Sequence, residues 1–173
     1  MEILRIPAER VSVLIGKDGE TKALIEKKCN IKLQIDAEGE VQMEGEPADV
    51  FLSKDVIQAI GRGFIPRIAL KLANDDYNLI IFPLREILPS EKAMKRIKGR
   101  VIGEEGRMKN EIENATESFV SVYGHTIALI SKIDTISYAK EAIEMLLNGA
   151  PHSSVYSYLG KARREIMEAR LRG

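Results

Sequence analysis

Two short glycine-bounded turns are the parts of this sequence best suited to hold a ligand. The first turn is Gly16-Lys17-Asp18-Gly19 after Leu14-Ile15, and the second is Gly103-Glu104-Glu105-Gly106 after Val101-Ile102. Glycine adopts backbone angles that strain other residues, and without a side chain it lets a phosphate approach the backbone. The N–H groups at the start of the following helix then point toward that anion. The pattern predicts a binding site for a phosphate backbone.

The two turns belong to a repeat with an offset of 87 residues, the distance from Gly16 to Gly103. The same offset carries Ile25 onto Ile112, and it also superposes an alternating apolar pair, Leu33 and Ile35 onto Val120 and Val122. One glycine pattern of this kind arises easily by chance. Two copies in the same helix and strand context indicate a duplicated module.

Composition limits the kinds of function that this chain can have. Its 173 residues allow one large or two small domains, and the repeat favours two. With 26 basic and 26 acidic residues the net charge is zero, so binding to a polyanion must come from local patches rather than bulk charge. The single cysteine, Cys29, and the two separated histidines argue against a disulfide or a metal site. We therefore expect no enzyme activity and no cofactor.

The sequence shows no apolar run of the length that spans a membrane and no amino-terminal segment of the secretory type. We expect a cytoplasmic protein without membrane contact.

Apolar periodicity and turn residues predict the order strand-helix-turn-helix-strand-strand-helix, twice. In the first copy, the helix over 20–29 is expected to turn Ala23, Leu24 and Ile25 inward. In the second copy, a strand over 77–87 is interrupted or ended by Pro83, and Asp134 is expected to cap the helix over 135–148.

This order predicts an α+β fold of two domains, each with a three-stranded antiparallel sheet and helices packed on one face. We expect the first domain at 1–63, an ordered linker at 64–76, the second domain at 77–151 and an extra C-terminal helix at 152–173. The last helix has one apolar stripe for packing and a basic face. We interpret that face first as solvated, with contact to RNA or a protein as the alternative.

The turns and the elements around them resemble type I KH domains, which hold about four nucleotides of single-stranded nucleic acid with a GXXG loop. The stretch Gly99-Arg100-Val101-Ile102-Gly103, followed by Arg107 and Val122-Tyr123-Gly124-His125-Thr126, is similar to archaeal two-KH-domain ribosomal RNA processing proteins. These are related to the eukaryotic factor called partner of Nob one. The resemblance implies binding to the 3′ region of small-subunit rRNA, with an endonuclease and a translation initiation factor as partners, and no catalysis.

RNA contact is expected from both turns and from basic residues near them. The set is Leu14, Ile15, Gly16, Lys17, Asp18, Gly19, Lys22, Lys32, Arg100, Ile102, Gly103, Glu104, Glu105, Gly106, Arg107 and Lys109. Two features depart from the usual KH pattern. Lys22 and Lys109 replace the apolar residue three positions after the second glycine, and the second turn carries two glutamates. Flanking cations are expected to outweigh these carboxylates.

Two other functions compete with this interpretation. One KH module could act as a docking platform in a protein-interaction adaptor, which zero net charge and the acidic second turn favour. The chain could also be a general RNA-binding translational regulator without a ribosomal role.

Overall fold

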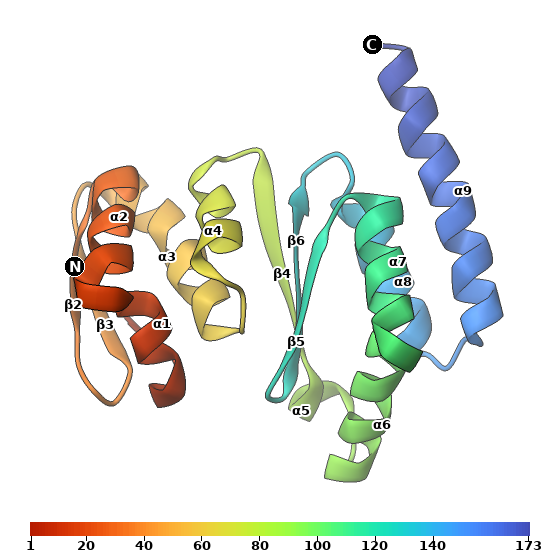
Figure 1. The fold of residues 1–173 in the computed structure, drawn as a ribbon, viewed down its shortest axis with the longest axis horizontal. Helices are drawn as coiled ribbons and strands as arrows, with labels where there is room; N and C mark the ends of the chain where they lie inside the picture. Colours follow the sequence, from red (N-terminus) through yellow and green to blue (C-terminus); the bar gives the residue numbers. More distant parts are fainter. The chain divides into compact units, whose positions relative to one another are not determined.

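The computed structural model describes residues 1–173, which divide into two compact units, Met1–Leu79 and Ile80–Gly173. The chain forms two three-stranded sheets, with strand order β1-β3-β2 in one and β4-β6-β5 in the other. In each unit the helices pack on one face of its sheet (Figure 1). The α+β architecture with two repeated sheets is therefore confirmed.

The first unit is built around its central strand, which pairs antiparallel with both neighbours. Val41 and Met43 of that strand are fully buried, together with Leu14 and Ile25 of the helices. The elements are β1 (Glu2–Arg5), η1 (Ala8–Arg10), α1 (Val11–Ile15), η2 (Lys17–Gly19), α2 (Glu20–Cys29), β2 (Lys32–Ile35), β3 (Glu40–Glu44), α3 (Pro47–Gly61), α4 (Pro66–Ala69) and η3 (Leu70–Ala73). The predicted linker thus carries α4 and η3, both of which pack on α3.

The second unit repeats this layout and adds one long helix. Its core includes Met108 and Ile112 of the helix after the turn, packed with Ile127 and Leu129 of the central strand. The elements of the second sheet and its helices are β4 (Tyr77–Pro83), α5 (Leu84–Ile87), α6 (Glu91–Ile102), η4 (Glu104–Gly106), α7 (Arg107–Thr116), β5 (Phe119–Tyr123), β6 (Thr126–Lys132), α8 (Ile136–Leu147) and α9 (His152–Leu171).

The extra C-terminal helix, α9, packs on α7 and α8. It buries four residues of its predicted apolar stripe, of which Val155 and Leu159 are fully inaccessible, whereas the fifth, Ala169, is exposed. Two arginines of its basic face form ion pairs: Arg163 lies 2.7 Å from Glu111 on α7, and Arg170 pairs with Glu117, the residue that follows α7. Packing and ion pairs together fix this helix to the unit. None of the helices combines the length and the apolar character that a membrane crossing requires.

Two local predictions were wrong, and a third was confirmed. Leu24 is 41% exposed and Ala23 is also exposed, because α2 buries only the stripe of Ile25 and Cys29, four residues apart. The N-cap of α8 is Thr135 instead of Asp134, and it makes no side-chain cap bond. The predicted end of the strand at Pro83 is confirmed, and the next four residues are helical.

A glutamate ties the helix after each turn to the edge strand of its sheet. Glu26 Oε2 on α2 accepts a hydrogen bond from Leu33 N on β2 at 2.9 Å. Glu113 Oε2 on α7 accepts one from Val120 N on β5, also at 2.9 Å. Each glutamate follows the second glycine of its turn by the same seven residues. The repeat therefore extends to a contact that holds helix and strand at a fixed spacing.

We predict that Glu113→Ala lowers the free energy of unfolding by about 1–3 kcal/mol, because it leaves the partly buried Val120 N–H without its acceptor. Glu113→Gln should lose less, since its amide oxygen can still accept the bond. Chemical denaturation measures both. Glu168→Ala on the exposed face of α9 is the matched control, and an equal loss there and at Glu113 would contradict the assigned role.

Candidate nucleic-acid interface

The two turns have the same backbone conformation to within a few degrees. Gly16 lies at φ 76°, ψ 177° and Gly103 at φ 76°, ψ 173°, a combination that is essentially restricted to glycine. The second residue of each tip, Asp18 or Glu105, has φ 55°, and the closing glycines have φ 76° and 77°. Matched angles at three of the four residues make the turn a repeated backbone feature.

The helices after the turns begin without a side-chain cap. Neither Gly19 before α2 nor Gly106 before α7 offers a capping side chain. Other helices, such as α3, α8 and α9, also begin without a side-chain cap, and Ser90, which accepts a bond from Ala93 N at the start of α6, is the exception. At each turn the N–H of the closing glycine donates to the carbonyl of the first glycine, and the first residue of the following helix donates to Lys17 O or Glu104 O. What the helix start offers an approaching anion is therefore mainly the positive end of its dipole. Both turns therefore have the backbone chemistry of a phosphate site.

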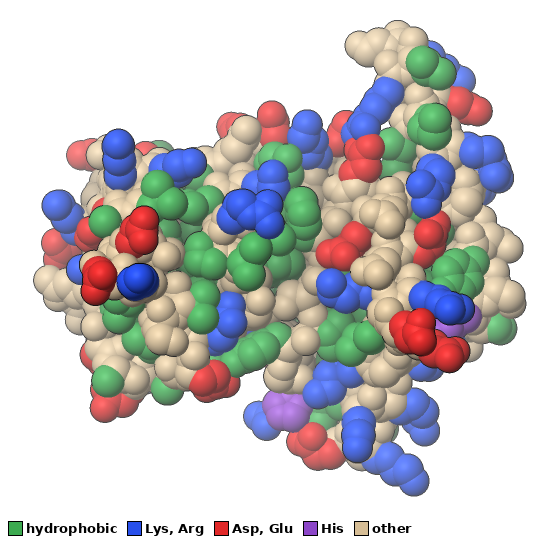
Figure 2. Space-filling view, in the orientation of Figure 1, with side chains coloured by type: hydrophobic (Ala, Val, Ile, Leu, Met, Phe, Trp, Pro, Cys, Tyr) green, Lys and Arg blue, Asp and Glu red, His purple; other side chains and the backbone are tan.

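The tips differ in charge although their backbones agree. Lys17 and Asp18 are exposed at the first tip, and Glu104 and Glu105 at the second. Arg107 approaches Glu105 to 3.8 Å, and both side chains are more than two-thirds exposed. Figure 2 shows that acidic and basic side chains are interspersed over most of the visible face, in keeping with zero net charge. The two tips therefore share a backbone conformation and differ in their electrostatic field.

The lysine that replaces the usual apolar residue is part of the glutamate contact in the second unit. Lys109 Nζ lies 3.4 Å from Glu113 Oε1, while the other oxygen of that carboxylate accepts the edge-strand N–H. Because Glu113 reaches β5, the stripe of Lys109 and Glu113 on α7 faces the edge of the sheet. The cation is therefore held on the side of α7 that faces β5. Lys22, its counterpart on α2, is partly exposed.

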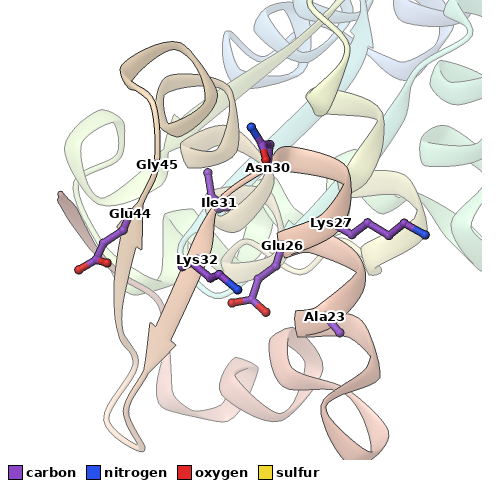
Figure 3. Close-up of a pocket in the computed structure, with 8 residues that line it drawn as sticks. All are labelled: Ala23, Glu26, Lys27, Asn30, Ile31, Lys32, Glu44 and Gly45. Atoms are coloured by element: carbon purple, nitrogen blue, oxygen red, sulfur yellow. The ribbon is translucent and has the colours of Figure 1, made fainter.

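In the first unit, a cleft lies between α2 and the start of β2 (Figure 3). Glu26 and Lys32 extend into the space between helix and strand, whereas Lys27 extends outward. The cleft is lined by Ala23, Glu26, Lys27, Asn30, Ile31, Lys32, Glu44 and Gly45. It lies along the same helix and edge strand as the first turn, so the two could serve one extended ligand.

The remaining residues that were predicted to contact RNA differ in how exposed their side chains are. Ile15 is partly exposed and Ile102 is 39% exposed, so both present apolar surface beside the glycines. Leu14 is fully buried and can only support the turn from below. Arg100 donates to Leu146 O at 2.8 Å and to Ala150 O, at the end of α8. The guanidinium group of Arg100 is therefore already hydrogen-bonded within the protein.

Sequence reasoning missed the two glutamates, Glu26 and Glu113. The 87-residue offset superposes them and was a signal that could have found them. Their acceptor role could not be read from it, because that depends on where the edge strand lies.

The one thiol lies apart from both tips, at the end of α2. Burial raises the pKa of the Cys29 thiol, which a hydrogen bond with Ser53 only partly offsets. A neutral, buried thiol is a poor nucleophile. The structure contains no group of three or more His, Cys, Asp or Glu side chains that could hold a metal ion. What the turns offer is backbone N–H groups and nearby lysines and arginines, which bind anions.

Comparison with known proteins agrees with this geometry. A family model described as the eukaryotic-type KH domain (KH domain type I) matches residues 79–164, and one described as the KH domain matches residues 1–59. The KH domain-containing protein MJ0443 of Methanocaldococcus jannaschii is 46% identical over 98% of this chain and 77% of its own length. The pre-rRNA-processing protein pno1 of Aspergillus oryzae is 30% identical over 66% of this chain, which spans only 45% of that relative.

A solved structure is similar over nearly the whole chain. It is the crystal structure of the a/eIF2alpha-aDim2p-rRNA complex from Pyrococcus horikoshii OT3, with a TM-score of 0.87 and 42% identity. The match covers 95% of this chain and 94% of that one.

The geometry of the turns predicts that their two glycines differ in tolerance. A Cβ on Gly103 would lie 2.8 Å from Met108 N, whereas one on Gly106 would meet almost nothing. We expect Gly106→Ala to cost about 1 kcal/mol of folding free energy, the usual penalty for a left-handed residue. Gly103→Ala should cost at least twice as much. Thermal or chemical denaturation of the two variants checks the order, and equal losses would contradict the turn geometry.

Proposed function

The chain belongs to the family of two-KH-domain proteins homologous to the pre-rRNA-processing protein Pno1, and on that basis we propose that it binds single-stranded RNA through both glycine turns. The observation that carries the proposal is the repeated turn, with its glycine-restricted angles and its uncapped following helix. A phosphate bound there receives N–H groups and the helix dipole without a side chain in the way. The protein acts by binding rather than by catalysis.

The surface beside each turn supplies the rest of the RNA contact. Ile15 and Ile102 provide apolar surface for unstacked bases, and Lys22, Lys32 and Lys109 provide cations along the helix and edge strand. Aromatic residues make up only 5% of the chain, so extensive base stacking contributes little. Bases are instead held by apolar contact and by hydrogen bonds to the edge-strand backbone.

The RNA that we propose is the 3′ region of small-subunit rRNA, bound during maturation in the cytoplasm. Support comes from the similarity to Pno1 proteins and to a protein solved in complex with rRNA and a/eIF2alpha. A translation initiation factor is accordingly a proposed partner. An endonuclease that cuts the same precursor is the second, since a binding protein in rRNA processing needs an enzyme to make the cleavage.

We predict that Lys17→Asp and Arg107→Asp each weaken binding of an RNA hexamer from the 3′ end of small-subunit rRNA by about tenfold, roughly 1.4 kcal/mol. Each change places a carboxylate where the phosphate must approach. Melting temperatures should stay nearly constant, because Lys17 is exposed and an acidic residue is favourable at the start of α7. Fluorescence anisotropy at fixed salt measures the affinities.

Arg172→Asp at the exposed end of α9 is the control for the change in net charge, and it should bind as the unaltered protein does. Unchanged affinity in both single variants and in the double variant would refute the role of the turns. Equal affinity of the unaltered protein for the rRNA hexamer and a scrambled hexamer would instead favour a general RNA-binding regulator.

A further inference from the structure

Positive charge is concentrated on α6, the helix that leads into the second turn. The helix carries five basic residues and one acidic residue, Glu91, in a chain whose net charge is zero. The five are Lys92, Lys95, Arg96, Lys98 and Arg100. In the space-filling view, blue side chains gather over α6 with few red ones among them (Figure 2). No other helix has such an excess of one sign.

Two of these five cations are engaged within the protein. Lys98 Nζ donates to Gly124 O at 2.9 Å, and Arg100 donates to the carbonyls at the end of α8. Lys92, Lys95 and Arg96 are exposed and take part in none of the ion pairs of the structure. Lysines on other helices do have such partners at i+4, for example Lys140 with Glu144.

The placement of the three free cations opposes helix stability. Lys92 and Lys95 are three residues apart, and Lys92 and Arg96 are four apart, spacings at which like charges repel on a helix surface. They also lie in the first half of α6, where the helix dipole favours acidic residues. An arrangement that weakens the isolated helix is understandable if an anion from outside compensates it.

The free cations lie on one line with the second turn. Residues three or four positions apart lie on the same face of a helix. This spacing puts Gly99 and Ile102 on one face with Lys92, Lys95 and Arg96. A Cβ on Gly99 would meet no atom within 4 Å, and Ile102 is 39% exposed. The face is therefore open from Lys92 to Gly103, a length of about 15 Å at the rise of an α-helix.

The first unit has no such face. The positions that the 87-residue offset pairs with Lys92, Lys95 and Arg96 are Arg5, Ala8 and Glu9. Arg5 already pairs with Glu40 at 3.4 Å. The free cations on the approach to the turn are thus a property of the second unit alone.

We propose that the exposed face of α6, formed by Lys92, Lys95 and Arg96, binds the phosphate backbone of the RNA segment that continues beyond the nucleotides held by the second turn. This inference rests on the proposed function, since the segment must first be anchored at Gly103–Gly106. The contact is electrostatic and independent of base identity, because lysine and arginine reach phosphates regardless of sequence. It offsets the two carboxylates at the tip and gives the second unit a longer RNA footprint.

The test compares two lengths of RNA on a triple variant, Lys92→Gln, Lys95→Gln and Arg96→Gln. Glutamine keeps helix propensity, so α6 should remain folded. The probes are the rRNA hexamer and 14-mers that extend it at the 5′ or the 3′ end. The hexamer should bind within about twofold of the unaltered protein. For the 14-mer that binds best to the unaltered protein, the triple variant should have about tenfold lower affinity. The slope of log affinity against log salt concentration should be smaller in magnitude by about two, the value for three phosphate contacts on a single strand.

The control triple variant, Lys161→Gln, Arg164→Gln and Arg172→Gln on α9, removes the same charge and should bind both RNA lengths normally. Unchanged 14-mer affinity in the α6 variant would overturn the inference. Equal losses for the hexamer and the 14-mer, or equal losses in the control triple, would overturn it as well. If Lys17→Asp and Arg107→Asp still weaken the hexamer in these cases, the proposed function stands without the inference.

Discussion

The backbone angle of the first glycine in each turn is the constraint on which the rest of the arrangement depends. At φ 76° and ψ near 175° the chain leaves one helix and enters the next within four residues, and a Cβ at Gly16 would lie 2.2 Å from Thr21 Oγ1. This reversal directs the start of α2 or α7 outward without a capping side chain. It also fixes the direction of those helices, so that Glu26 and Glu113 reach the edge strands and hold helix and strand together.

The two copies keep this frame and differ in what surrounds it. In the first, one lysine stands at the tip, and a cleft lined by Lys27, Lys32 and Glu26 follows the helix. In the second, two glutamates stand at the tip, and the positive charge lies on α6 behind it. A shared backbone geometry with different fields allows one protein to hold two stretches of RNA in different ways. The two copies therefore share the turn geometry and differ in the charges around it.

The sequence was most informative where a local rule decides the structure. Glycine spacing, apolar alternation and the offset predicted both turns and the order of the strands and helices around them. It was least informative where a long side chain acts at a distance. Arg100 was expected beside RNA, yet its guanidinium reaches carbonyls 46 and 50 residues further along the chain. Leu24 was expected inside, but helical periodicity alone does not tell which apolar residue at the margin of a buried stripe becomes exposed.

The central claim is that the repeated turns hold small-subunit rRNA, and crosslinking in native cells tests it most directly. Ultraviolet crosslinking, followed by sequencing of the bound RNA and mass spectrometry of the attached peptides, reports both partners at once. The account predicts reads concentrated at the 3′ end of small-subunit rRNA and crosslinked peptides that include residues 14–22 and 100–109. Reads spread over messenger RNAs in proportion to their abundance, with crosslinks remote from both turns, would contradict it.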